Sequence, residues 1–202
     1  MSRRKLAYGV GINDWHTTIS NGSSKHIPEY KMWLRVLERS LSEKWKVDNP
    51  TYKDVSVDPK WYRMTIFIED VSTLVGYDQA LNNSWHLDKD LLVKGNKHYS
   101  KDTCCFVPIE INSLMVLSRS SRGVYPSGVC FRKRQPRRPY CATIRRGGIV
   151  TTLGNYATAE EAFYVYKEAK ENYIKEVANK WKDQIDVRVY EALMNWTVEI
   201  TD

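Results

Sequence analysis

Two stretches in the N-terminal half repeat apolar residues at the three- and four-residue steps of an amphipathic helix. The first stretch covers residues 29–45, and Asp48-Asn49-Pro50 ends it. Its stripe consists of Tyr30, Trp33, Leu34, Leu37, Leu41 and Trp45. The second opens at Pro59, and its stripe consists of Trp61, Met64, Phe67, Ile68 and Val71. We expect both stripes to form core rather than to stack on a ligand.

The middle of the chain alternates short apolar runs with polar ones. Residues 85–92 predict a strand, residues 93–103 a polar loop with Gly95-Asn96, and residues 104–107 a second strand. Pro108 then starts a helical turn. The predicted order is therefore strand, loop, strand, helix.

The C-terminal half predicts three short antiparallel strands followed by a helix. The strands cover residues 123–131, 140–145 and 149–153, with a basic turn at 132–139 and a tight hairpin at Gly147-Gly148. Thr158 and Glu161 form a capping box at the start of the helix. The apolar stripe of this helix predicts that it covers one face of the sheet and leaves the other face free. A last short amphipathic helix is expected over residues 187–196.

Together these elements predict an α+β fold in four parts. Residues 1–28 are polar and turn-rich and are expected to be a flexible lead-in. Residues 29–118 hold the helices and the strand–loop–strand–helix module, residues 119–182 the three-stranded sheet with its helix, and residues 183–202 the C-terminal helix.

Composition narrows the class of protein. The sequence contains no run of about 18 apolar residues, so we expect no membrane span. The basic N-terminus is followed by no apolar signal core. The four cysteines form no CxxC pair and show no zinc-site spacing with histidine. We therefore expect a protein of a reducing cytoplasm.

Positive charge is concentrated in one window. The formal net charge is +7, yet no Asp or Glu lies between Ile111 and Ala159. The basic residues of that window are Arg119, Arg122, Arg132, Lys133, Arg134, Arg137, Arg138, Arg145 and Arg146. Such segregation favours a nucleic-acid backbone as partner, and arginine suits bidentate contacts to phosphate and guanine. The alternative is a solvated basic face or a disordered arm.

The sheet predicted in this window resembles a known DNA-binding domain. Gly128-Val129, Tyr140-Cys-Ala-Thr-Ile144, Leu153-Gly-Asn-Tyr156 and Thr158-Ala-Glu-Glu-Ala162 are similar to the plant Apetala-type domain. The resemblance implies three strands packed on one helix, with the sheet bound to double-stranded DNA. The DNA contacts that it implies, together with the basic turn, are Arg132, Lys133, Arg134, Arg137, Arg138, Tyr140, Arg145 and Arg146.

Candidate chemistry lies just upstream of the basic window. On an extended strand His86, Asp88 and Asp90 point the same way, and Lys89 points the opposite way. An acid beside an Asn or His from a following helix makes a hard oxygen and nitrogen site, which suits one Mg²⁺ bridging a phosphate.

The same segment resembles the phage HNH homing endonucleases, whose fold is the His-Me finger (ββα-metal) module. The resemblance rests on Trp85-His-Leu-Asp-Lys-Asp-Leu-Leu92, Lys94-Gly-Asn-Lys97, and Phe106-Val-Pro108 with Ile111-Asn112. It implies that Asp88 and Asn112 bind the metal, Mg²⁺ or Mn²⁺, with Asp90 as a further ligand. Lys89 stands where the family usually has its general-base His, and a lysine with an ordinary pKa is a poor base at neutral pH. His86 and His98 are the alternative bases.

The expected function is therefore a metal-dependent endonuclease of phage homing type, which cuts double-stranded DNA in the host bacterial cytoplasm. One alternative is a non-cleaving DNA-binding protein, such as a repressor or a host-interaction factor on a degenerate HNH fold. Another is a protein-binding module that uses the helix at residues 187–196. For that helix, packing back on its own domain or closing a homodimer is favoured over a protein-binding role.

Overall fold

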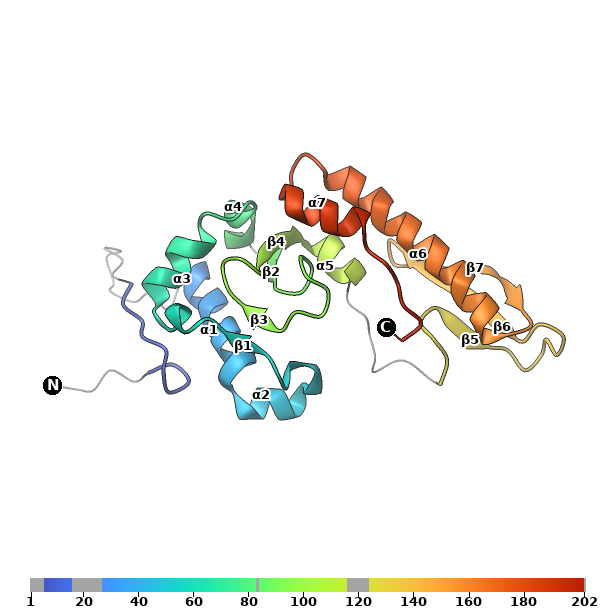
Figure 1. Cartoon of the computed structure of the whole chain (residues 1–202), viewed down its shortest axis with the longest axis horizontal. Helices are drawn as coiled ribbons and strands as arrows, with labels where there is room; N and C mark the ends of the chain where they lie inside the picture. Colours follow the sequence, from blue (N-terminus) through green and yellow to red (C-terminus); the bar gives the residue numbers. More distant parts are fainter. Residues whose placement is uncertain (1–5, 16–26, 83, 116–123, 202) are drawn as a thin grey trace. The chain divides into compact units, whose positions relative to one another are not determined.

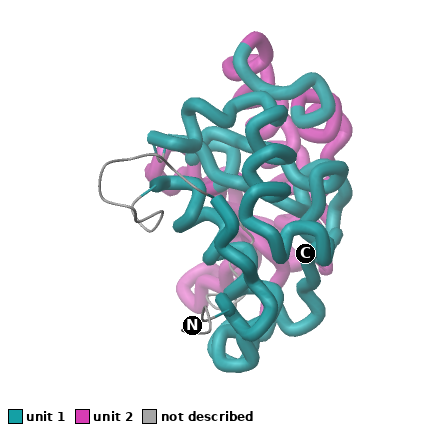
Figure 2. The backbone as a smooth tube through the Cα atoms, turned by 90° about the vertical axis from the view of Figure 1, so that its left-hand side faces the viewer, with its two compact units in different colours: residues 1–112, 184–189 teal, residues 113–183, 190–202 magenta. Residues whose placement is uncertain are grey.

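The computed structural model describes residues 6–15, 27–82, 84–115 and 124–201 (Figure 1). The chain divides into two compact units, coloured separately in Figure 2. Unit 1 comprises residues 1–112 and 184–189, and unit 2 comprises residues 113–183 and 190–202. The boundary expected between residues 118 and 119 falls outside the described residues. The fold is mixed α+β, as the sequence predicts.

Unit 1 begins with two helices where the sequence predicts one. α1 (Pro28–Leu41) and α2 (Glu43–Asp48) are separated at Ser42, whose side chain accepts a hydrogen bond from the backbone N–H of Trp45 at 3.2 Å. A serine that caps a new helix competes with continuation of the preceding one. A single turn of 3₁₀ helix, η2 (Pro50–Tyr52), follows.

The segment after Pro59 also differs in detail from the prediction. It forms a 3₁₀ turn, η3 (Pro59–Tyr62), an extended residue Arg63, and then α3 (Met64–Val71) and α4 (Tyr77–Leu81). Trp33 donates its indole N–H to the carbonyl of Trp61 at 2.7 Å, which ties α1 to η3. Both tryptophans are fully buried, so the two apolar stripes form core as expected.

Residues 6–15 belong to what the sequence predicts as a lead-in, yet they make specific contacts. The carboxylate of Asp14 pairs with Arg63 at 2.8 Å and accepts the backbone N–H of Thr65 at 2.9 Å. Ile12 exchanges backbone hydrogen bonds with Tyr62 and Met64. This part of the segment is therefore tied to the start of α3.

Two small sheets complete unit 1. β1 (Ser56–Val57) pairs in parallel with β3 (His98–Tyr99). β2 (Trp85–Asp88) pairs in antiparallel register with β4 (Cys105–Pro108), and α5 (Ile109–Met115) follows β4 directly. The order strand, loop, strand, helix is observed, but three details of the prediction are wrong. The first strand ends at Asp88 and not at Leu92, the predicted loop contains β3, and Pro108 ends β4 instead of starting the helix.

Unit 2 contains an antiparallel sheet in the order β5-β6-β7, formed by Val129–Phe131, Tyr140–Arg146 and Ile149–Tyr156. α6 (Ala159–Trp181) runs along it, and the predicted capping box of Thr158 and Glu161 is present (Figure 1). The last helix, α7 (Val187–Met194), contains the division between the two units. Among the described residues, no helix is both long and apolar enough to cross a membrane.

The two faces of this sheet differ. Residues paired across antiparallel strands share a face, and faces alternate along each strand. Ala142 and Ile144 are buried on the face that α6 covers, where Arg146 also reaches α6. Thr143 and Arg145 lie on the opposite face, here called the outer face, together with their partners Thr152 and Val150. The predicted arrangement, with one covered face and one free face, is therefore observed.

The contact between sheet and helix yields a stability prediction. Gly128 has a φ of +75°, and a Cβ added to it would lie 2.1 Å from the ring of Tyr166 on α6. We expect Gly128→Ala to lower the free energy of unfolding by roughly 2–3 kcal/mol, because the ring would have to move and the backbone is left-handed. Urea unfolding followed by circular dichroism measures this.

Gly147 is the matched control, with a φ of +55° and no atom within 4 Å of an added Cβ. Gly147→Ala should cost roughly 1 kcal/mol, the backbone contribution alone. Equal costs at the two positions would contradict the close approach of Tyr166.

Candidate functional site

The candidate site is centred on β2 and the start of α5. His86 and Asp88 lie two residues apart on β2 and therefore share one face of the strand. Asn112, in the first turns of α5, reaches this strand, and its side-chain amide nitrogen lies 3.1 Å from Nδ1 of His86. The structure thus places the amide of Asn112 against the imidazole of His86, 26 residues away, while the carboxyl group of Asp88 shares the strand face of His86.

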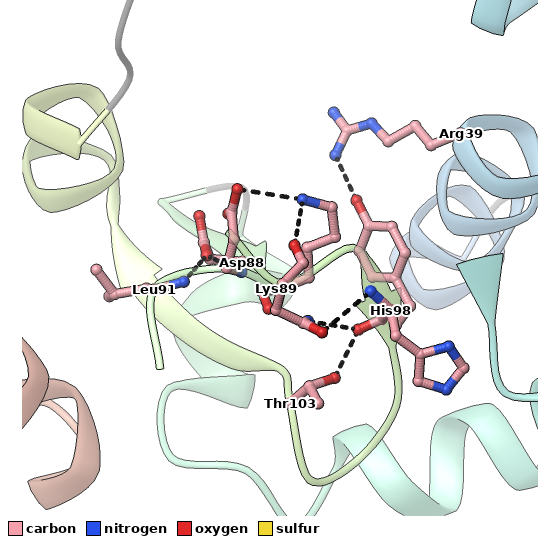
Figure 3. Close-up of polar contacts among 9 residues, drawn as sticks. Arg39, Asp88, Lys89, Leu91, His98 and Thr103 are labelled. Atoms are coloured by element: carbon pink, nitrogen blue, oxygen red, sulfur yellow. Dashed lines mark hydrogen bonds and ion pairs between the residues drawn. The ribbon is translucent and has the colours of Figure 1, made fainter. Parts of the chain in front are cut away.

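Asp88 ends β2 by capping the turn that follows. Its Oδ1 accepts the backbone N–H groups of Asp90 at 2.9 Å and of Leu91 at 2.8 Å (Figure 3). Burial and the neighbouring Asp90 carboxylate raise the pKa of Asp88 to about 6. Because the strand stops here, Asp90 is not placed by strand alternation, as the sequence pattern had suggested, but by this turn.

Lys89 is held as a cation inside the loop. Its ammonium lies 3.2 Å from a carboxylate oxygen of Asp90 and 3.4 Å from the carbonyl of Asn96. It also lies 5.8 Å from the ring centroid of Tyr52 and 5.9 Å from that of Tyr99. Only 11% of the side chain is exposed. Each of these contacts suits a charged ammonium, which has no lone pair with which to accept a proton.

Asn96 holds the loop between β2 and β4 in shape, a role that the sequence analysis did not assign. Its amide nitrogen donates to the carbonyls of Lys89 at 2.6 Å and His98 at 2.8 Å. The hydroxyl of Thr103 donates to the same His98 carbonyl at 2.6 Å (Figure 3). The Gly95-Asn96 pair signals a turn, but only the folded loop brings these carbonyls to one amide.

His98, the third candidate base, lies apart from the group formed by His86 and Asp88. Its Nδ1 lies 2.9 Å from the hydroxyl of Ser56 on β1, and its ring points away from Asp88 (Figure 3). The imidazole is therefore part of the link between β1 and β3.

Two arginines of α1 act on this site, and the sequence analysis missed them because it treated that helix as core. Burial lowers the pKa of His86, and the nearby charges of Arg35 and Arg39 lower it further. Arg39 also donates to the hydroxyl of Tyr99 at 3.4 Å (Figure 3). With its pKa lowered, His86 is neutral at pH 7, the form that can accept a proton.

The neighbouring cysteines do not supply a nucleophile. Cys104 and Cys105 are buried, and burial raises the pKa of Cys104 to about 12 and also raises that of Cys105. A buried protonated thiol is unreactive.

The acidic residues fit a hard divalent cation. Asp88 has a raised pKa beside a second carboxylate, so a cation at this point would favour its ionised form. Within the described ranges, no three His, Cys, Asp or Glu side chains gather as a metal-binding group. Mg²⁺ commonly binds through one or two carboxylates and keeps several waters, so the carboxylates of Asp88 and Asp90 and the amide oxygen of Asn112 are donors of the type that Mg²⁺ or Mn²⁺ takes.

The described basic residues of unit 2 lie on the outer face of the sheet, in the β5–β6 turn, or on the face that α6 covers. Arg132 and Arg145 lie on the outer face, where Nη2 of Arg132 reaches Oγ1 of Thr152 at 3.3 Å. Four further basic side chains are exposed in the β5–β6 turn, namely Lys133, Arg134, Arg137 and Arg138. Because β5 ends at Phe131, turn geometry and not strand alternation places them. Arg119 and Arg122 lie outside the described residues.

Tyr140 and Arg146 lie on the face that α6 covers. Tyr140 packs edge-on against Tyr125 and Phe131, with ring centroids 5.5 Å apart in each pair. Arg146 lies 3.4 Å from Glu176 and 5.1 Å from the ring centroid of Tyr173. These two residues do not share a surface with Arg132 and Arg145.

No model of a known protein family, no curated protein and no solved structure matches this chain.

The buried carboxyl of Asp88 predicts a pH-dependent stability. Its pKa in the folded state, about 6, lies above its ordinary value of 3.8, so ionisation of Asp88 destabilises the folded state. The penalty is absent below pH 4, grows between pH 4 and 6, and is complete above pH 6. We expect Asp88→Asn, whose amide oxygen can still cap the turn, to be more stable than the parent above pH 6 by roughly 2 kcal/mol in metal-free buffer.

The two proteins should be equally stable near pH 4. Thermal unfolding with EDTA, compared across this pH range, checks the prediction. Asp54→Asn is the control, because the ion pair of Asp54 with Lys97 lowers its pKa and its removal should bring no gain above pH 6. A loss of stability in Asp88→Asn that is the same at pH 4 and pH 7 would show that the charge of Asp88 is not the cause.

Proposed function

We propose that this protein is a metal-dependent endonuclease that hydrolyses phosphodiester bonds in double-stranded DNA. One observation carries the proposal: His86, with a lowered pKa, lies against Asn112 on the same strand face as the buried acid Asp88. A neutral imidazole beside a hard-oxygen donor is what phosphodiester hydrolysis requires.

In this proposal His86 is the general base. The amide N–H of Asn112 faces the lone pair of Nδ1 at 3.1 Å, so Nδ1 is the nitrogen that would take a proton from a water molecule that displaces this contact. Asp88 and Asp90, with Asn112, would hold Mg²⁺ or Mn²⁺, and the bound ion would supply Lewis-acid stabilisation of charge on the phosphate. Lys89, which is paired with Asp90 at 3.2 Å, orients that carboxylate.

Unit 2 would hold the DNA. The outer face exposes Arg145 and Thr152, and the β5–β6 turn adds four exposed basic side chains next to Arg132. A β-sheet with an arginine-rich free face suits the major groove, and the turn suits backbone phosphates. We assign DNA contacts to this surface and not to Tyr140 or Arg146.

The order of elements in residues 85–115 supports a His-Me finger of the phage HNH type. An antiparallel strand pair is joined by a long loop and followed at once by a helix that delivers Asn112. The second candidate function is a non-cleaving DNA-binding protein on this fold. The observation that favours it is Lys89, a cation held where such enzymes usually have their base.

Cleavage assays on His variants test the catalytic proposal. We expect His86→Ala to lower the rate of Mg²⁺-dependent DNA cleavage by at least about 100-fold, because a general base contributes that much. His98→Ala is the matched control and should cut within a few-fold of the parent, since its ring bonds Ser56 instead. If the parent binds DNA but cuts no substrate with Mg²⁺ or Mn²⁺, the non-cleaving function is correct.

DNA affinity as a function of salt tests the assignment of the outer face. We expect the double variant Arg132→Ala with Arg145→Ala to bind a mixed-sequence duplex more weakly, with a slope of log affinity against log salt that is smaller by about 2. Fluorescence anisotropy measures both quantities. Arg146→Ala removes the same kind of charge from the covered face and should keep the parental slope. An equal loss in both proteins would mean that the outer face is not the DNA-binding surface.

A further inference from the structure

Arg39 on α1 is a half-buried guanidinium that lacks an acidic partner. Its Nη1 donates a hydrogen bond to the hydroxyl of Tyr99 at 3.4 Å, and its Cζ lies 5.6 Å from the ring centroid of Tyr52. Among the described residues no carboxylate lies within ion-pair distance of it. A guanidinium carries several N–H donors, and none of the other donors of Arg39 is buried without a partner, so they are accessible to an incoming anion.

A second cation uses the same two rings. Lys89 lies over both Tyr52 and Tyr99, but it has Asp90 as its counter-ion, whereas Arg39 has none. Asp88, the acid of the candidate site, directly precedes Lys89 in the chain. Tyr52 and Tyr99 therefore link Arg39 to the Asp88–Lys89 corner, the point at which β2 ends and the loop begins. Arg35 lies one turn earlier on the same side of α1 and is exposed.

We propose that Arg39, together with Arg35, binds a backbone phosphate of the DNA beside the Asp88–Lys89 corner. This inference rests on the proposed function, because it takes DNA as the ligand of unit 1. A planar guanidinium fork matches two phosphate oxygens, and phosphate is the anion that DNA brings. Tyr99 and Tyr52 are the positioning residues that fix the plane of the Arg39 fork. The site would hold the strand in register for the candidate catalytic group.

Binding and cleavage of a short mixed-sequence duplex test the proposal on the full-length protein. We expect Arg39→Ala to reduce the slope of log affinity against log salt by about 1, as loss of one phosphate contact requires. At pH 8, where His86 is neutral with or without the charge of Arg39, the KM for cleavage should rise by about tenfold with kcat within about twofold, because an anchoring contact acts equally on ground and transition states. Arg35→Ala, at an exposed position that should not disturb folding, should change both quantities in the same direction.

Two further variants separate phosphate binding from other effects. Lys60→Ala removes an exposed positive charge from η3 in the same unit and should leave the slope and KM unchanged. Tyr99→Phe removes the hydroxyl that orients Arg39 and should raise KM while leaving the salt slope within error, since the charge remains.

The outcomes distinguish this inference from the proposed function. If DNA is bound with an unchanged slope in both Arg39→Ala and Arg35→Ala, the phosphate site is wrong and the endonuclease proposal stands on its own tests. If the slope falls but the parent does not cut, the phosphate site stands and the proposed chemistry fails. If the parent does not bind DNA, both proposals fail.

Discussion

The candidate site depends on a local cap, in which the carboxylate of Asp88 accepts hydrogen bonds from two backbone N–H groups. This cap ends β2, turns the chain, and sets where Lys89 and Asp90 lie. It also uses Oδ1 of Asp88 for structure, and the carboxyl group of Asp88 interacts in addition with the side chain of Asp90. Structure and proposed catalysis thus compete for one side chain, and its raised pKa reflects the cost of keeping an acid in this position.

Around this cap the loop from β2 to β4 is built from polar contacts more than from apolar packing. The amide of Asn96 joins the carbonyls of Lys89 and His98, and Thr103 reaches the second of these carbonyls. A loop closed by such a network resists small displacements, because breaking one bond leaves a half-buried carbonyl unmet. The rigidity is useful where an acid and an imidazole must hold their relative positions.

Periodicity and turn chemistry predict most of the fold. The stripes around Trp33 and Trp61, the hairpin at Gly147-Gly148 and the capping box at Thr158 are local patterns, and each element exists where it is expected. The failures occur where a side chain competes with the backbone. Ser42 divides the first helix, and Asp88 shortens the first strand of the site. Propensity along the chain does not reveal which residue will win such a competition.

The sequence predicts which residues belong to the candidate site better than it predicts what each of them does. The sequence groups His86, Asp88 and Asn112, but contacts between distant segments decide what each does. Tyr52 and Arg39 come from helical segments that the sequence marks as core or leaves unassigned, and only in the folded unit does the ring of Tyr52 lie against both Arg39 and Lys89. Similarly, Tyr140 and Arg146 belong to the basic window by composition, while strand alternation turns them toward α6.

The environment of Lys89 bears on whether the protein cuts or only binds DNA. Loss of a catalytic base without compensation would leave a position with no functional constraint, and a lysine there would extend into solvent, as lysine side chains generally do. Here the ammonium is enclosed by Asp90, a carbonyl and two aromatic rings, an arrangement that keeps a neighbouring carboxylate oriented beside Asp88. Meanwhile a second imidazole, that of His86, lies on the same face as Asp88, with a partner amide and a lowered pKa. Under the proposed function, the enclosed side chain of Lys89 and the imidazole of His86 on the strand face of Asp88 would fit a site whose general base lies at position 86 rather than at position 89.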